Sequence, residues 1–429
     1  MNEFAYQDAL YGRVKLDQTT SDLVCTPVVQ RLRDVRLSNV DSISMPGIAN
    51  LTRYEHSLGV AHLAGMVNLR RRLSDEDRSV LIAAGLLHDA AIAPFGHLFE
   101  EALEYVAENF HHEDKWSLLR ATFNPQEVGG FGMQVLHGRD SGLQRWADRH
   151  FKSRADVVLD TIFEAVKGGG PLGKCIAGDM DLDNLDNVTR IAYHMGLELR
   201  RTLPLDIVQA VIDVTDGGVT FAESALALVS EWLDLRSQVY ERLMMSPEDF
   251  CGKSMLLYAF VHAYEAGELF CTDWKLTDRE IITRLLASRV EGVKETTQRW
   301  LSGEPWEVSP LMWFDGEPPS YAVVRRFVTE RFGTNKRAFA YRIKDKRVRQ
   351  TRIVTGSGTV TVLGTRPARW LFGVAAAGRT TIRAREDGHL IADAEKFFGV
   401  RFLEVAGASG APQPVLWDRG TYARPLFAG

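Results

Sequence analysis

The sequence predicts a mainly α-helical protein with a smaller α+β region at its C-terminal end. From about residue 20 to residue 310, apolar residues recur three and four positions apart, which is the spacing of helices that bury one face. After about residue 320 they alternate with other residues, as in strands. The 429 residues suffice for two or three structural units. We therefore expect one unit over residues 1–315 and a second over residues 316–429.

Individual elements follow from local patterns. Thr52 and Glu55 have the spacing of a capping box, so a helix is expected to begin there. Strands are expected because apolar or β-branched residues alternate, and Gly356-Ser357-Gly358 is typical of a turn before one of them. The expected helices cover about 80–88, 94–106, 185–195, 223–243 and 392–398, and the expected strands cover 339–343 and 359–362.

Composition narrows the class of protein. Hydrophobic residues make up 45% and charged residues 25% of the chain, as in soluble globular proteins, and no apolar run is long enough to span a membrane. The first residues lack the basic and then apolar pattern of a secretion signal. The four cysteines are scattered without a CxxC pair, which indicates free thiols in a reducing compartment. We expect a cytoplasmic protein without a membrane partner.

Positive charge is concentrated in one stretch. The formal net charge is −5, but residues 325–352 hold 11 Lys and Arg residues against two acids. Clustered cations attract phosphates of any origin. Three interpretations remain open: a solvated face or an oligomer contact, a site for a nucleotide effector, and a site for nucleic acid.

Three separated segments place histidine and aspartate where a helical core rarely holds them. His56 follows the predicted helix start, and His88-Asp89 ends a helix that is apolar on all sides. A buried carboxylate costs several kcal/mol unless it is paired or bound to a metal. The third segment, 179–186, holds four aspartates. Two imidazoles and two carboxylates suit Mn, Fe, Mg or Zn, with positions left for water and a phosphate oxygen.

The order His…His-Asp…Asp resembles the metal-binding signature of the HD-domain phosphohydrolases. Within this family the chain is most similar to the deoxynucleotide (dGTP-type) triphosphohydrolase branch, and the likeness covers roughly residues 20–260. It rests on RYEHSLGV at 53–60, on AGLLHD at 84–89 followed by PFGHLFE at 94–100, and on DLDNLD at 181–186. The resemblance implies a helical HD bundle with its core at about 50–200.

The resemblance also implies residue roles. The expected ligands of one divalent metal ion are His56, His88, Asp89 and Asp183. The expected catalytic residues are His97 as general acid, Glu100, which orients a histidine, and His112 as a second catalytic histidine. Imidazoles suit proton transfer because their pKa lies near neutrality. Arg53 is expected to contact a phosphate, and Tyr240 is expected to lie near the nucleotide.

Several positions depart from the family pattern, and the changes fall in the expected substrate pocket. Arg36 replaces a glutamine that contacts the sugar, and Asn184 replaces a basic residue that faces phosphate. Asn187 replaces a tyrosine, while Ile92 and Ile191 replace polar residues. A site built to hydrogen-bond one hydroxyl rejects analogues that lack it, so we expect an altered specificity.

The resulting expectation is a metal-dependent phosphohydrolase that cleaves a (deoxy)nucleoside triphosphate to nucleoside and triphosphate. Two alternatives remain: hydrolysis of another phosphate ester by a nucleotidase or phosphodiesterase, and a nucleotide-sensing or nucleic-acid-binding protein with reduced turnover. Relatives in the family assemble as dimers or larger rings, so a homo-oligomer is expected.

Overall fold

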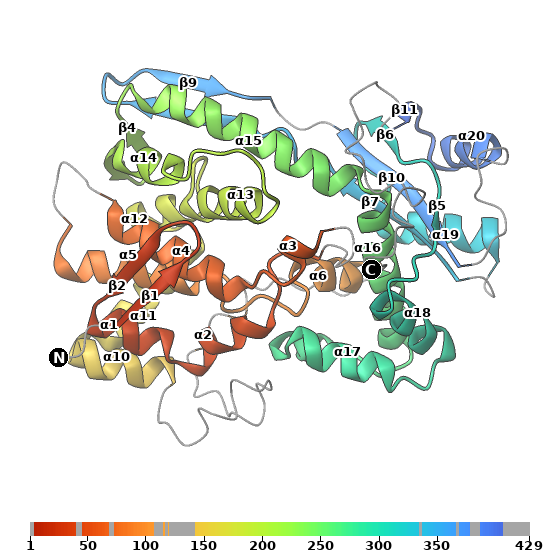
Figure 1. Ribbon diagram of the computed structural model, residues 1–429, viewed down its shortest axis with the longest axis horizontal. Coiled ribbons are helices and arrows are strands. Elements are labelled where there is room, and N and C mark those ends of the chain that lie inside the picture. Colours follow the sequence, from red (N-terminus) through yellow and green to blue (C-terminus); the bar gives the residue numbers. More distant parts are fainter. Residues whose placement is uncertain are drawn as a thin grey trace, which may run out of the picture.

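The fold is mainly helical, with a smaller α+β region at the C-terminal end, as predicted (Figure 1). The computed structural model describes residues 4–39, 45–67, 73–106, 115, 119, 142–333, 337–365, 369–377 and 387–405. In those residues no helix is long and apolar enough to cross a membrane.

The segment before the first long gap in this description begins with a hairpin and continues as helices. A helix is expected to begin after Thr52, and the Thr52 side chain does accept a hydrogen bond from the backbone N–H of Glu55 at 3.4 Å. The elements are β1 (Phe4–Asp8), β2 (Gly12–Leu16), α1 (Gln18–Val24), α2 (Pro27–Arg31), η1 (Leu32–Asp34), α3 (Pro46–Ala49), α4 (Arg53–Met66), α5 (Asp75–Leu87) and α6 (His97–Tyr105).

The next segment adds most of the remaining helices. Its β3–β4 hairpin lies inside a range that we expected to be helical, because five- and four-residue strands leave little trace in helical spacing. The elements are α10 (Leu143–Phe151), η3 (Lys152–Arg154), α11 (Ala155–Val166), α12 (Gly170–Ile176), α13 (Leu182–His194), α14 (Leu203–Gln209), β3 (Val211–Thr215), β4 (Gly218–Phe221), α15 (Ala225–Met245), α16 (Pro247–Glu265), η4 (Cys271–Lys275), α17 (Asp278–Leu286) and α18 (Glu291–Leu301).

The C-terminal elements form two small sheets and two helices. The strand expected at 339–343 lies in β7, the one expected at 359–362 overlaps β9, and the helix expected at 392–398 lies in α20, so these three predictions are confirmed. The elements are β5 (Glu307–Val308), β6 (Met312–Asp315), α19 (Tyr321–Phe332), β7 (Ala338–Lys344), β8 (Thr351–Thr355), β9 (Val360–Leu363), β10 (Arg369–Ala376), α20 (Asp387–Phe398) and β11 (Phe402–Val405).

Two glycines allow α4 to lie close to its neighbours. A Cβ atom on Gly85 of α5 would lie 3.2 Å from the carbonyl oxygen of Val60, and one on Gly59 of α4 would lie 2.0 Å from a carboxylate oxygen of Asp186. The small residues therefore let α5 and α13 both pack closely against α4. These three helices carry the histidines and aspartates singled out above.

The sheet at the C-terminal end draws strands from both sides of the expected division at 315/316. Strand β10 pairs antiparallel with β7 on one side and with β5 and β6 on the other, and β11 continues from β6. Strands β5 and β6 precede residue 316, so we propose that this unit begins before Glu307. Helices α16 and α19 both pack on β7, which explains why Ala340 is buried although strict alternation predicted a half-buried strand.

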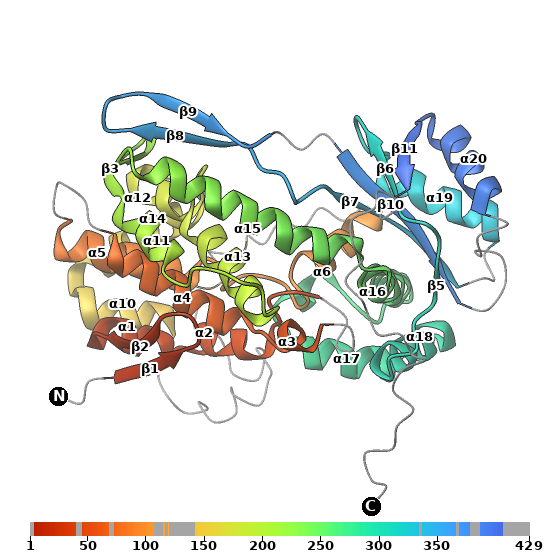
Figure 2. The same cartoon turned by 45° about the horizontal axis from the view of Figure 1, so that its top comes forward.

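The other sheet links the two regions. Its strand order is β3–β4–β8–β9, with β8 parallel to β4. Figure 2 shows the β8–β9 hairpin reaching past α15 to the helical region. A segment from beyond residue 316 thus completes a sheet that begins in the helical part of the chain.

Candidate metal centre

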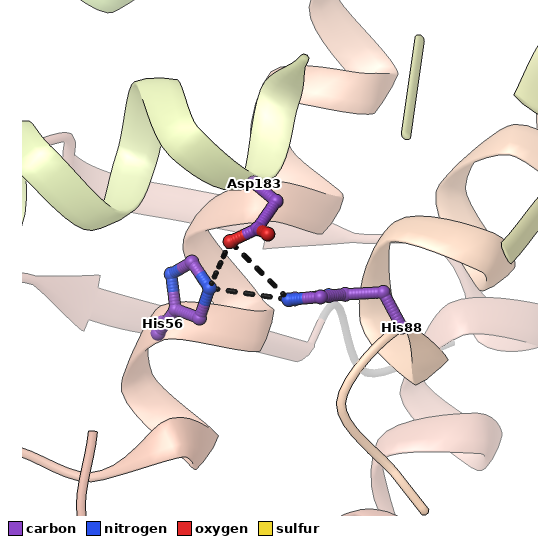
Figure 3. Close-up of side chains that lie close together, drawn as sticks. All are labelled: His56, His88 and Asp183. Carbon is purple, nitrogen blue, oxygen red and sulfur yellow. Dashed lines mark hydrogen bonds and ion pairs between the residues drawn. The ribbon is translucent and has the colours of Figure 1, made fainter. Parts of the chain in front are cut away.

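Three elements bring together the residues expected to bind a metal. His56 is the fourth residue of α4, His88 is the C-cap of α5, and Asp183 lies in the first turn of α13. The His56 Nε2 atom is 3.1 Å from His88 Nε2 and 3.0 Å from Asp183 Oδ1, and the last two atoms are 3.7 Å apart (Figure 3). These three side chains offer ligand atoms that all lie within 4.8 Å of one another.

The outer ring nitrogens fix which nitrogen carries a proton. His88 Nδ1 is 2.8 Å from the carbonyl oxygen of Gly85, which only accepts, so Nδ1 donates. His56 Nδ1 likewise donates to Asp186 Oδ1 at 2.8 Å. In the neutral rings both Nε2 lone pairs therefore face one point, together with a carboxylate oxygen. Such facing lone pairs repel unless a cation lies between them, so this donor set fits a divalent metal.

Electrostatics also favours positive charge at this point. Burial alone would lower the pKa of His88, but Asp89 and Asp183 outweigh it and raise that pKa to about 9. Burial opposes a raised pKa of His56 too, and hydrogen bonds to Asp183 and Asp186 overcome it. The carboxylates thus stabilise a cation beside the two rings.

Asp89 lies next to the cluster and has a cationic partner of its own. Its Oδ2 atom is 3.4 Å from His88 Nε2, 4.0 Å from His56 Nε2 and 2.5 Å from Arg53 Nη1. Burial would raise the pKa of Asp89, but Arg53 and His88 hold it well below its usual value. Arg53 and Asp89 are far apart in sequence, and α4 and α5 bring them together.

Behind His56 lies a buried ion network that sequence reasoning did not identify. Arg190 of α13 donates to both oxygens of Asp186, at 2.8 and 2.9 Å, and to Asp8 at 3.1 Å. The hydroxyl of Tyr11 donates to Asp186 at 2.9 Å. Arg190 and Asp186 are both 0% exposed. Their spacing of four residues on a helix was the available sign of this pair.

The turn before α6 carries the expected general acid. His97 Nδ1 is 2.8 Å from Glu100 Oε2, and the His97 side chain is 58% exposed. Gly96 has φ +57°, and a Cβ atom there would lie 2.5 Å from Arg53 Nη2. His97 therefore directly follows Gly96, whose backbone lies close to the Arg53 guanidinium. His112 lies outside the described residues.

The remaining expected substrate residues occupy different settings. Arg36 donates to Asp278 through Nε at 3.1 Å. Asn184 accepts from Arg236 at 3.2 Å, and the Arg236 guanidinium lies 4.4 Å from the ring centroid of Tyr240. The side-chain oxygen of Asn187 is buried and has no hydrogen-bond partner among the described residues. Among these substrate residues, Asn184 is next in sequence to Asp183, which belongs to the metal cluster.

Ile92 and Ile191 are packing residues in this chain. Ile92 is 0% exposed and lies in a small apolar cluster with Leu32 and Val35, against which Tyr54 packs. Ile191 is 3% exposed and belongs to the main core. Both positions carry apolar side chains because the space around them is apolar.

The basic stretch does not form one uncompensated patch in the described residues. Acids from distant segments pair with several of its arginines: Arg331 with Asp393 at 3.0 Å and Arg349 with Asp181 at 3.0 Å. Arg342 lies over the rings of Tyr321 and Trp370. Further ion pairs join Arg325 to Glu265, Arg326 to Glu330, Arg337 to Glu295 and Arg347 to Asp345.

Comparisons with known proteins agree with this geometry. The family model described as HD domain matches residues 53–217, which contain His56, His88 and Asp183. The deoxynucleoside triphosphate triphosphohydrolase SAMHD1 homolog of Dictyostelium discoideum is 32% identical over 204 residues, or 44% of this chain and 36% of that protein. The uncharacterized protein YwfO of Bacillus subtilis is 24% identical and covers 65% of each chain.

A solved structure shares the fold. The crystal structure of a phosphohydrolase from Bacteroides thetaiotaomicron superposes with a TM-score of 0.62 at 16% identity, over 88% of this chain and 100% of that one. The chain spans from about a third to two thirds of the length of the two curated relatives named above. The chain thus carries an HD domain over residues 53–217, with the histidine and aspartate cluster inside it, and it resembles HD-domain phosphohydrolases.

Proposed function

We propose that this protein hydrolyses a (deoxy)nucleoside triphosphate to nucleoside and triphosphate, with a specificity altered from that of standard dNTP triphosphohydrolases. The observation that carries the proposal is the convergence of His56 Nε2, His88 Nε2 and Asp183 Oδ1 on one point, with both outer ring nitrogens already donating elsewhere. The likeness to the Dictyostelium relative, a deoxynucleoside triphosphate triphosphohydrolase homolog by name, supports a nucleotide substrate. Asp89 is proposed as a fourth ligand, since its Oδ2 lies beside both histidines.

In the proposed reaction the chain's own residues orient the ester and supply a proton. A bound divalent cation would withdraw charge from a phosphate oxygen and so favour attack at phosphorus. Arg53 stabilises the negative charge that develops on the phosphate. A water oxygen bonds to phosphorus and releases one proton to solvent as the bond to the 5′ oxygen breaks, and His97 gives the 5′ oxygen a proton while Glu100 holds the imidazole. His112 is proposed as a second catalytic histidine.

The altered positions define what the pocket is expected to reject. Arg36, Asn184, Asn187 and Tyr240 are proposed to line the substrate site. Asn184 offers an amide where the resemblance implies a cation, and the packed side chains of Ile92 and Ile191 have no polar atom to offer. We therefore propose a substrate that makes fewer polar contacts to sugar and phosphate than a standard dNTP does. We also propose a cytoplasmic homo-oligomer, and a nucleotide effector or nucleic acid stays the proposed ligand of residues 325–352.

The test combines metal content with turnover. Purified protein is stripped with chelator, reloaded separately with Mn, Fe, Mg, Co or Zn, and assayed against dNTPs, NTPs, nucleoside monophosphates and diesters. Phosphate release is read by malachite green, with and without pyrophosphatase and polyphosphatase. We expect nucleoside and triphosphate from at least one triphosphate. The absence of turnover from every ester with every metal would overturn the proposal, and tight nucleotide binding in that case would indicate a sensing protein.

Substitution of the cluster provides the structural control. His56→Ala, His88→Ala and Asp183→Ala should each lower bound metal at least tenfold and abolish turnover. His150→Ala is the matched control, because this histidine pairs with Asp22 and Thr19 between α1 and α10 and contacts no member of the cluster. Retained metal in the three cluster variants would contradict the assignment of the centre.

A further inference from the structure

The turn that leads into α6 has a strained backbone. Phe95 has φ +58°, a conformation that L side chains rarely adopt, and the next residue, Gly96, has φ +57°. Such a conformation is unfavourable at a residue other than glycine and persists only when its surroundings hold it. The Phe95 side chain is 0% exposed and packs on the rings of Phe260 and Trp300.

A buried carboxylate and an amide from outside the segment matched by the HD model bond to this turn, and the amide is Asn39, whose Nδ2 donates to the carbonyl oxygen of Phe95. Asp278 is the first residue of α17 and is 5% exposed. Its Oδ1 atom accepts the backbone N–H of Phe95 at 2.7 Å. Its Oδ2 atom accepts both the backbone N–H of Arg36, at 3.0 Å, and the Arg36 Nε at 3.1 Å. In Figures 1 and 2 helix α17 lies near the N-terminal helices in both views.

The second contact of Asp278 leads to the start of α4. Arg36 forms an isolated β-bridge with Thr52, and the backbone N–H of Arg53 donates to the carbonyl oxygen of Val35 at 2.9 Å. One carboxylate thus bonds both to Arg36, whose segment pairs with Thr52 and Arg53, and to the turn that precedes His97. The Arg36 guanidinium also lies 5.2 Å from the centroid of the Phe95 ring, so it contacts the turn directly.

Arg31 joins the segment before Asp278 to the segment before Phe95. Arg31 is 2% exposed and donates to the carbonyl oxygens of Trp274 and Leu276, each at 2.8 Å, and to that of Ile92, also at 2.8 Å. The residues just before Asp278 are therefore anchored to the segment just before Phe95. Asp278 has little freedom to move away from the turn.

We propose that Asp278 is a positioning residue, which holds the Phe95–Gly96 turn so that His97 is presented to the leaving oxygen next to Arg53. The proposal rests on the proposed hydrolase function. It gives Asp278 no contact with substrate. A group misplaced by about 1 Å can cost about 100-fold in rate, so loss of this carboxylate should act on turnover.

The experiment compares three variants of the full-length, metal-loaded protein. Asp278→Ala removes both contacts, while Asp278→Asn keeps an oxygen that accepts from Phe95. Asp273→Ala is the matched control: this acid is 7% exposed, accepts from the backbone N–H of Phe270 at 2.9 Å and pairs with Arg284 at 2.8 Å, and neither partner belongs to the turn. Readouts are kcat and KM separately, metal content, and amide hydrogen exchange of the peptide that spans residues 93–98.

We expect Asp278→Ala to lower kcat 10- to 100-fold with metal content within about threefold, and to change KM less than kcat. Its 93–98 peptide should exchange at least tenfold faster than that of the wild type. Asp278→Asn should restore most of the kcat, and Asp273→Ala should leave kcat and exchange of this peptide unchanged. Unaltered exchange in Asp278→Ala, or an equal loss of kcat in Asp273→Ala, would overturn the proposal.

The two proposals fail in distinguishable ways. If the wild-type protein turns over no ester, the proposed function fails, and the exchange measurement still decides whether Asp278 holds the turn. If the wild type is active and Asp278→Ala exchanges faster without loss of kcat, the turn is held by Asp278 but His97 does not depend on it, and the positioning role is refuted.

Discussion

The imidazole of His56 is oriented by a carboxylate that itself is held by an arginine. Asp186 accepts from His56 Nδ1, from Tyr11 and from Arg190, so its ring-facing oxygen cannot rotate freely. Burial would raise the pKa of Asp186, but Arg190 and His56 hold it well below its usual value, which keeps the carboxylate an acceptor. A carboxylate behind a ligating histidine fixes the tautomer and raises the basicity of the other nitrogen.

This arrangement predicts the effect of changing Asp186. Asp186→Asn should weaken metal binding 10- to 100-fold, because the ring of His56 loses its charged acceptor. Tyr11→Phe removes one hydrogen bond to the same carboxylate and should weaken binding much less. Competition with a chromophoric chelator measures both affinities. Equal affinity in Asp186→Asn and the wild type would contradict an orienting role for this residue.

For single residues, the sequence predicted which side chains form the metal centre, but it did not predict which side chains they bond to. His56 and His88 could be singled out from their short segments, whereas only the family resemblance distinguished Asp183 from the other aspartates at 179–186. The pairing of Arg53 with Asp89 could not, because it depends on how two helices cross. Arg36 was expected at the substrate, yet its guanidinium bonds to Asp278, which lies 242 residues later and carries no local motif.

Outside the metal centre, one carboxylate, that of Asp22, links helix α1 to helix α10. Asp22 of α1 is 2.9 Å from His150 Nε2 and 3.3 Å from Arg149 Nη1 of α10. Burial would raise the pKa of Asp22, but hydrogen bonds from Gln18, His150 and Arg149 outweigh it and lower that pKa. A carboxyl with a lowered folded-state pKa adds stability above its unfolded pKa of about 4, and that stability is lost as the pH falls through the folded pKa.

The expected result is a pH-dependent effect of Asp22→Asn. At pH 7 this variant should melt below the wild type, and the two melting temperatures should converge as the pH falls below about 4. Asp148→Asn on α10 serves as control, because its exposed carboxylate bonds only to Gln144 among the contacts that the structure records. Calorimetry measures both melting temperatures from pH 7 to pH 3. A difference in melting temperature between Asp22→Asn and the wild type that stays the same at every pH would contradict this prediction.

The elements themselves were mostly predictable where their patterns are local. The capping spacing at Thr52 and the apolar spacing in α5, α13 and α15 identified the helices that matter for the centre. The β3–β4 hairpin was missed because its pairing with β8 depends on residues more than 130 positions away. Burial on both faces of β7 was missed for the same reason.

Across the whole molecule, the helical region and the C-terminal region share sheets and a core. Strand β6 supplies Met312, Trp313 and Phe314, which are 0%, 1% and 1% exposed, and it pairs with β10 and β11 from beyond residue 316. Sequence periodicity predicts a change from helices to strands after about residue 320. It could not show that β5 and β6 pair with strands from beyond residue 316, because two- and four-residue strands carry almost no pattern.

A shortened chain tests this shared packing. A protein that ends at Asp315 would expose the apolar side chains of β6, each of which stabilises the fold by about 1.5–3 kcal/mol when buried. It would also remove β8 from β4. We expect it to aggregate or to melt well below the full chain in size-exclusion and circular-dichroism measurements. A monodisperse product with an unchanged melting temperature would show that the division at 315/316 is a true domain boundary.

The central claim is that one cation binds where α4, α5 and α13 meet. Anomalous diffraction from crystals of the manganese-loaded protein measures this most directly. The account predicts one strong anomalous peak within bonding distance of His56 Nε2, His88 Nε2 and an oxygen of Asp183. A map with no peak there, or with manganese bound only elsewhere on the chain, would contradict it.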